Sequence, residues 1–95
     1  MRNNWEETSK IPGLSEEFIR ENSDKVDWYC ISRYQELSEG FIRENSDKVD
    51  WEYISRYKNL SKKFVRENID KIYLNKLIQN ENIDKEFIDK IKYLL

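Results

Sequence analysis

The chain has 95 residues and a formal net charge of −2; 38% of its residues are hydrophobic, 38% are charged and 14% are aromatic. This length supports one small domain, and the many large rings argue against a disordered chain because each ring buries a large area. The balanced charge does not favour a nucleic-acid binder, and a single cysteine, Cys30, excludes an internal disulfide.

No apolar run approaches the roughly 20 residues that span a bilayer. The opening sequence MRNNWEETSK lacks the apolar core of a signal peptide. One cysteine also suits a reducing compartment. We therefore expect a protein of the cytoplasm that makes no membrane contact.

The eleven residues FIRENSDKVDW occur twice, at 18–28 and at 41–51, so the step from Trp28 to Trp51 defines one period. Aligned at this period, the chain contains three full units, 14–36, 37–59 and 60–82. Partial units follow at 83–95 and precede at 3–11, where Trp5 stands one period before Trp28. Such a period is typical of stacked arrays, because one unit cannot bury its apolar face alone.

Each unit is predicted to begin with a short helix. A serine precedes it, and a serine hydroxyl can accept from the free N–H groups of the first turn. In the last unit Asp84 takes this role. The helix is expected to end near an asparagine, which tolerates the left-handed conformation common at helix ends; the predicted caps are Ser15, Ser38 and Ser61 at the start and Asn22, Asn45 and Asn68 at the end.

A second helix is predicted to begin at Asp27 and at Asp50, again as N-caps, and to carry WYCISRY or WEYISRY. Trp28, Ile31 and Tyr34 recur at every third position and predict one apolar stripe. In the third unit Leu74, Leu77 and Ile78 replace this stripe, and Asn80 falls where Tyr34 and Tyr57 stand. A strand over VDWYCISRY is the alternative, but its alternation is poor and no hairpin turn follows.

Equivalent apolar positions predict five rows of core residues through the repeats. These rows are Leu14, Leu37, Leu60 and Ile83; Phe18, Phe41, Phe64 and Phe87; Ile19, Ile42, Val65 and Ile88; Val26, Val49 and Ile72; and Trp5, Trp28, Trp51 and Leu74. The prediction is therefore one all-α domain, 1–95, built of about eight short helices as helix–turn–helix repeats stacked in a small solenoid.

The pattern F-I-R-E-x-x-D-K-V-D-W-x-x-I-S-x-Y resembles a short helical repeat of proteins from giant viruses, bacteriophages and low-GC bacteria. The resemblance covers most of residues 14–82 and implies a helical array of viral or mobile-element origin. The family's repeats are not tied to catalysis. A chain this short is also similar in style to small anti-CRISPR proteins, which bind and obstruct a Cas effector nuclease. That likeness implies an inhibitor acting in the host bacterial cytoplasm.

Catalytic and cofactor-binding equipment is scarce in the sequence. The chain has no histidine, which is the commonest general base and metal ligand. Cys30 stands where Tyr53 and Lys76 stand in the other units, so we interpret it as a packing or surface variation. The carboxylates follow the repeat and mix with Lys and Arg, which is typical of solvated ion pairs. No enzyme activity, cofactor or metal is expected.

The second helices carry the residue types that dominate protein-binding hot spots, tyrosine and arginine. Exposed tyrosines there would form a row along one face of the array, and we expect this face to bind a protein; the candidate residues are Tyr29, Arg33, Tyr53, Arg56 and Tyr57.

The sequence thus predicts a non-enzymatic protein-binding module, with a CRISPR-Cas effector or its guide-RNA complex as the partner that the resemblance implies. A structural or scaffold repeat is one alternative. A weak binder of single-stranded nucleic acid is another, since residues 60–95 are mildly basic, with eight basic and six acidic side chains. The oligomeric state does not follow from the sequence.

Overall fold

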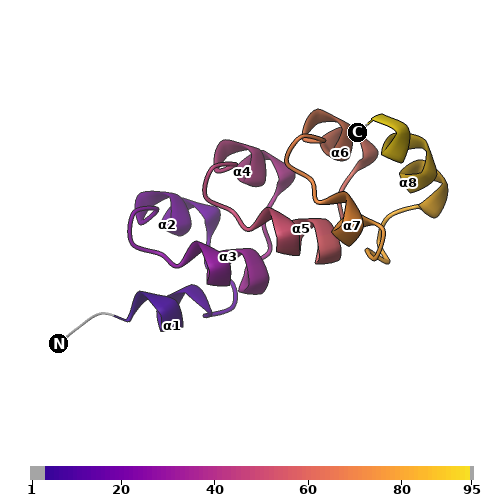
Figure 1. The fold of residues 1–95 in the computed structure, drawn as a ribbon. Helices are drawn as coiled ribbons and strands as arrows, with labels where there is room; N and C mark the ends of the chain where they lie inside the picture. The colour runs from indigo at the N-terminus through magenta and orange to yellow at the C-terminus, as the bar shows by residue number, and fades with distance from the viewer. Residues whose placement is uncertain (1–3, 95) are drawn as a thin grey trace. The chain divides into compact units, whose positions relative to one another are not determined.

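The computed structural model describes residues 4–94. It is all-α in this part, so the strand alternative is wrong and the predicted all-α class with about eight short helices is confirmed (Figure 1). Residue 3 of the predicted unit 3–11 and residue 95 of the unit 83–95 lie outside the described residues. The elements are α1 Trp5–Ser9, α2 Glu16–Glu21, α3 Trp28–Tyr34, α4 Glu39–Glu44, α5 Trp51–Tyr57, α6 Lys62–Glu67, α7 Leu74–Leu77, α8 Lys85–Ile91 and the 3-10 helix η1 Lys92–Leu94.

The chain forms two compact units, Met1–Asp50 with helices α1 to α4 and Trp51–Leu95 with helices α5 to α8 and η1. In each unit the second helices of consecutive repeats contact each other, α1 with α3 and α5 with α7. The first helices, α2 with α4 and α6 with α8, lie in the other layer of their unit (Figure 1). Each helix is about two turns long or shorter, so none is stable without its neighbours.

The predicted N-caps are confirmed at the first helices. The hydroxyl of Ser15 accepts from the Phe18 N–H at 3.0 Å, and Ser38 and Ser61 accept from Phe41 and Phe64 at 3.1 Å. Asp84 caps α8 through the Glu86 N–H. At α3 the carboxylate of Asp27 accepts from the Cys30 N–H, as predicted.

The asparagines end the first helices by a different route from the one predicted. Their φ angles lie between −113° and −117°, outside the left-handed region. Each side-chain amide instead donates to the carbonyl four residues earlier, at 2.9 Å, in the pairs Asn22–Phe18, Asn45–Phe41 and Asn68–Phe64. The same carbonyls also accept the backbone N–H of these asparagines, at 3.1 Å, so the side-chain amide adds a second bond at the helix end and the backbone does not turn left-handed.

An aromatic pair joins consecutive repeats from 3–11 to 60–82. Trp5 packs on Phe18 with centroids 6.4 Å apart, Trp28 on Phe41 at 6.1 Å, and Trp51 on Phe64 at 5.9 Å. The contact therefore runs between the predicted Trp row and the predicted Phe row. Phe41 and Phe64 are buried at 1% and 0% exposure, while the tryptophans are partly buried.

A buried serine makes the second repeating contact. Ser9, Ser32 and Ser55 each donate their hydroxyl to the carbonyl four residues earlier, at 2.6–2.8 Å. The same oxygens accept the backbone N–H 18 residues later, from Asp27, Asp50 and Tyr73, at 2.9–3.0 Å. All three serines are fully buried, so each hydroxyl fixes where the next second helix begins.

Two buried side-chain amides hold the ends of second helices, and the sequence analysis did not assign this role. Gln35 donates to the carbonyls of Ser9 and Ile11 and accepts from the Leu14 N–H. Asn80 donates to the carbonyls of Ser55 and Lys58. Both supply donors to carbonyls at or beyond a helix C-terminus, which have no partner within the helix.

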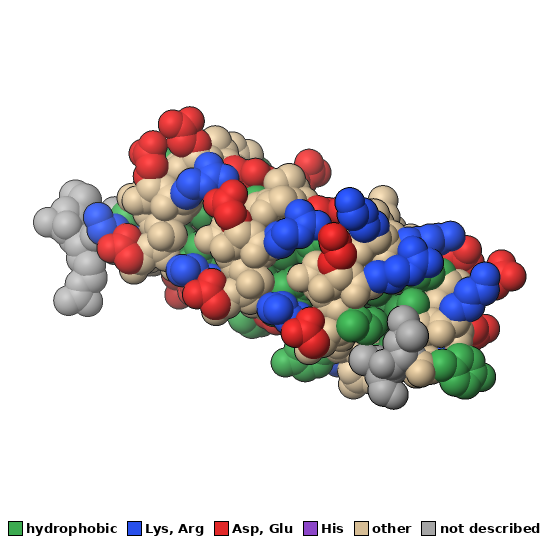
Figure 2. All heavy atoms as spheres, turned by 90° about the horizontal axis from the view of Figure 1, so that it is seen from above, with side chains coloured by type: hydrophobic (Ala, Val, Ile, Leu, Met, Phe, Trp, Pro, Cys, Tyr) green, Lys and Arg blue, Asp and Glu red, His purple; other side chains and the backbone are tan. Residues whose placement is uncertain are grey.

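Charged side chains also follow the repeat. In Met1–Asp50 the Glu16 carboxylate accepts from the Ser38 N–H and hydroxyl, and Arg20 pairs with Glu44 at 2.9 Å. On the face seen in Figure 2, Lys and Arg side chains lie beside Asp and Glu side chains. The Arg20 hydrogen bond lowers the pKa of Glu44 and raises the pKa of Arg20.

The predicted apolar stripe of the second helix is wrong at its last position. Ile31 is fully buried, but Tyr34 is 54% exposed. In the third unit Leu77 of α7 is buried, while Ile78, the residue after this helix, is 52% exposed. For Tyr34 the reason is that an i, i+3, i+6 spacing drifts around the helix by about 60° at each step because each residue turns about 100°, so the third member leaves the buried face.

We predict that Phe41→Ala destabilises the protein by about 3–5 kcal/mol, because it removes a buried ring and leaves a cavity against Trp28. Chemical unfolding followed by circular dichroism measures the change. Tyr34→Ala is the control, and this exposed site should change stability by about 0.5 kcal/mol or less. Equal losses for the two variants would contradict the inter-repeat stacking.

We also predict that Glu44 titrates with a pKa below the ordinary glutamate value of about 4.3. A lowered folded-state pKa stabilises the fold above the unfolded pKa, and this contribution is lost as pH falls through the folded value. NMR titration of the Glu44 carboxyl measures it. Arg20→Gln should raise the midpoint, whereas Lys25→Gln, which removes an exposed cation outside the pair, should not. An unchanged midpoint in Arg20→Gln would contradict the pairing.

Candidate protein-binding site

The candidate residues of α3 form a pre-arranged pair. Tyr29 is 59% exposed, and the guanidinium carbon of Arg33 lies 3.3 Å from the centre of its ring. Arg33 Nη1 also donates to Asp50 Oδ2 at 2.6 Å and to the Tyr29 carbonyl at 3.3 Å. The carboxylate therefore holds the guanidinium against the ring, where it adds a cation–π contact.

The candidate residues of α5 form a second cluster. The rings of Tyr53 and Tyr57 lie 4.8 Å apart at 38°, and Arg56 lies 4.6 Å from the centre of the Tyr57 ring. Arg56 Nε donates to Gln79 Oε1 at 3.2 Å. Tyr57 is 53% exposed, whereas Tyr53 and Arg56 are partly buried. Tyr57 is thus the exposed ring of this cluster.

The five candidate residues fall into two groups, one in each compact unit. Tyr29 and Arg33 belong to Met1–Asp50; Tyr53, Arg56 and Tyr57 belong to Trp51–Leu95. The predicted row across the repeats stays a prediction. Tyr73 is not among the residues predicted from the sequence, although it is 47% exposed. Tyr73 occupies the repeat position of Asp27 and Asp50, just before α7. A tyrosine in place of a capping aspartate at a helix start could have indicated an exposed ring.

The α3 pair does not present isolated positive charge. Met1–Asp50 contains seven Lys and Arg against twelve Asp and Glu, a net charge of −5. Arg33 is bound to a carboxylate within this unit. An arginine whose charge is neutralised in this way attracts a phosphate group less strongly, because phosphate binding depends on unneutralised cations. The geometry of α3 therefore favours a protein surface over a nucleic acid.

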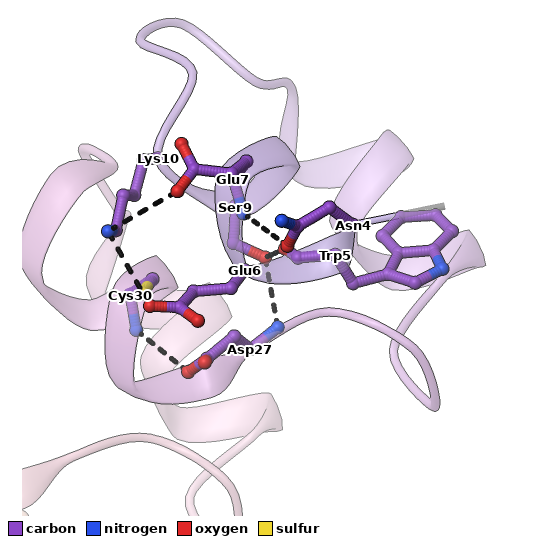
Figure 3. Close-up of polar contacts among 8 residues, drawn as sticks. All are labelled: Asn4, Trp5, Glu6, Glu7, Ser9, Lys10, Asp27 and Cys30. Atoms are coloured by element: carbon purple, nitrogen blue, oxygen red, sulfur yellow. Dashed lines mark hydrogen bonds and ion pairs between the residues drawn. The ribbon is translucent and has the colours of Figure 1, made fainter. Parts of the chain in front are cut away.

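Cys30 is the side chain most suggestive of nucleophilic chemistry, and it lies inside the packing beside α1 (Figure 3). It is 4% exposed, and burial raises the pKa of its thiol, with a further contribution from the Asp27 carboxylate. Lys10, paired with Glu6 and Glu7 at 3.6 and 3.9 Å, lowers the thiol pKa by a smaller amount. A buried, protonated thiol is a poor nucleophile, so Cys30 is a packing residue.

Residues 4–94 contain no group of three or more Cys, Asp and Glu side chains arranged to hold a metal ion. Within the same residues, every helix is too short and too polar to cross a bilayer.

Comparison with protein families, curated proteins and solved structures finds no match to this chain. The resemblance to viral helical repeats therefore stays a prediction.

We predict that the Cys30 thiol of the folded protein reacts with a disulfide reagent at neutral pH at least about tenfold more slowly than in denaturant, because the thiolate is the reactive form. Absorbance of the released thiol measures the rate. The denatured chain is the control. Equal rates in the two states would contradict a buried, protonated thiol.

Proposed function

We propose that this chain is a non-enzymatic helical-repeat module that binds a protein partner through the tyrosine–arginine clusters of α3 and α5. The observation that carries the proposal is the Tyr29–Arg33–Asp50 arrangement. An exposed ring carries a guanidinium already fixed by a 2.6 Å ion pair. Such a group loses little side-chain entropy on binding, which favours high affinity per contact.

The composition of the clusters supports the same function. Tyrosine and arginine are among the residues most enriched in binding hot spots, and they act best when neighbouring groups exclude water. In α5 the Tyr57 ring lies 4.8 Å from the Tyr53 ring and 4.6 Å from the Arg56 guanidinium. The repeat scaffold presents these groups on short helices whose ends are fixed by buried hydrogen bonds, so the clusters are held in place before binding.

The finer proposal concerns the partner. We propose that the partner is a bacterial CRISPR-Cas effector nuclease or its guide-RNA complex, which the bound chain obstructs, because the chain is short, is similar in style to small anti-CRISPR proteins, and carries a repeat that resembles those of bacteriophage and mobile-element proteins. This step is supported by size and resemblance alone and has its own test. A guide-loaded effector should lose target cleavage when the protein is added in excess, and unchanged cleavage would remove this partner while leaving protein binding open.

The binding test uses alanine variants of the two clusters. The partner is captured from host lysate, identified by mass spectrometry, purified and titrated against the protein. Tyr29→Ala, Arg33→Ala and Tyr57→Ala should each weaken binding by about tenfold or more, as hot-spot residues do. The matched controls are Lys25→Ala for the lost charge and Tyr93→Ala for the lost ring, since both residues are exposed and lie outside the clusters.

Circular dichroism of every variant separates lost binding from lost folding. Equal weakening in the controls, or full affinity in all three cluster variants, would contradict the proposed surface. Binding of single-stranded nucleic acid that collapses as salt rises would instead support the nucleic-acid alternative.

A further inference from the structure

A shallow hollow of about 290 Å³ lies on Trp51–Leu95, lined by Ile78, Lys85, Ile88, Asp89 and Lys92. Four of these residues lie on α8 and at the start of η1 at helical spacing. Ile78 adds an apolar side chain that is 52% exposed. Ile88 is 5% exposed and forms the apolar floor. We call this surface the α8 face.

The repeat register shows what normally covers such a face. In Met1–Asp50, Glu16 and Arg20 of α2 reach forward to the next repeat, where Glu16 binds Ser38 and Arg20 lies over Phe41. In Trp51–Leu95, Lys62 and Arg66 do the same from α6: Lys62 pairs with Asp84 at 3.9 Å and Arg66 lies 5.1 Å from the centre of the Phe87 ring. Lys85 and Asp89 occupy these two positions in α8.

The α8 face is unsuited to another repeat of the same kind. Asp89 occupies the repeat position of Arg20 and Arg66. If a second copy stacked head to tail, Asp89 would face Glu21 of that copy, which is the repeat equivalent of the Glu44 that Arg20 binds. Ile78 stands where Ser9, Ser32 and Ser55 accept the N–H of the following second helix. Head-to-tail stacking would therefore bring two carboxylates together and leave a buried N–H without its acceptor, at a cost in both cases.

The same face is complementary to itself. Lys85 and Asp89 are four residues apart on one helix, so a two-fold axis near residue 87 places Lys85 of each copy opposite Asp89 of the other. Ile78 and the floor residue Ile88 line the same hollow, so such a contact would cover the exposed Ile78 side chain beside the two ion pairs. A two-fold contact requires this kind of self-complementary surface.

We propose that the α8 face binds the same face of a second copy of this chain, in an antiparallel α8–α8 contact closed by two Lys85–Asp89 ion pairs. Asp89 already pairs with Lys92 of its own chain at 3.3 Å, with side-chain exposures of 72% and 44%. An exposed pair of this kind is weak, and the second carboxylate oxygen stays available to Lys85 of the other copy. The dimer is independent of the proposed function, because the tyrosine–arginine clusters are on α3 and α5.

Sedimentation equilibrium of the full chain tests the proposal across concentrations of roughly 10 µM to 1 mM, the range suited to a small interface. The wild-type mass should rise from 11.7 kDa towards twice that value and stop there. Lys85→Glu gives a face with two acids beside Lys92, and Asp89→Lys gives a face with three bases, Lys92 included. Each variant alone should dimerise at least about tenfold more weakly, because like charges then oppose each other.

An equimolar mixture of the two single variants should dimerise again as a heterodimer, since an acidic face then meets a basic one. The double variant K85E/D89K should also recover the homodimer. Lys63→Glu, which changes an exposed lysine of α6 outside the face, is the control and should behave as wild type. Circular dichroism checks that each variant is folded.

Three results would overturn the proposal. One is a wild-type chain that stays monomeric over the whole range. Another is a dimer that is insensitive to both single variants, which would place the contact elsewhere. The third is a mass that grows beyond the dimer and grows further in Asp89→Lys, because removing the Asp89–Glu21 repulsion promotes head-to-tail stacking.

Discussion

The buried serine hydroxyl at Ser9, Ser32 and Ser55 is the contact on which the repeat depends. It donates within its own helix and accepts a backbone N–H just before a later second helix, so one oxygen fixes the spacing of α1 and α3, and another that of α5 and α7. Burial makes this bond obligatory, because an unpaired N–H at that site has no water to bind. Helices of four to seven residues can then fold together although none is stable alone.

The register explains why polar positions of the repeat match as closely as apolar ones. Arg20 binds the glutamate of the following unit, so arginine and glutamate must recur together. The asparagine at the end of each first helix caps a carbonyl, and the Ser23 carbonyl accepts from the Trp28 indole at 2.9 Å. Nothing in the structure explains the identity of Asp24 and Lys25, which are exposed.

Features set by local sequence could be predicted, and features set by a neighbouring repeat could not. The caps at Ser15 and Asp27 depend on a few adjacent residues, so the pattern was sufficient for them. The capping role of Gln35 depends on the carbonyls of Ser9 and Ile11, which belong to an earlier unit of the repeat. The same limit applies to the candidate site. Tyr29 and Arg33 were identified by residue type, but their stacking depends on Asp50, which belongs to the next repeat, 37–59.

The departures from the repeat are concentrated in the third and fourth units, and they change what those units can contact. Tyr73 replaces the capping aspartate of α3, and α7 shortens to four residues without a side-chain cap. Asn80, where the earlier units have a tyrosine, binds two carbonyls near the end of α5. Ile78 then replaces the serine acceptor, and Asp89 replaces the forward-reaching arginine. The first of these two changes removes the hydroxyl that accepts the next N–H and leaves an apolar side chain, and the second replaces a positive charge with a negative one. Because the α8 face has lost these two groups that bind the next repeat, it is suited to binding a different surface.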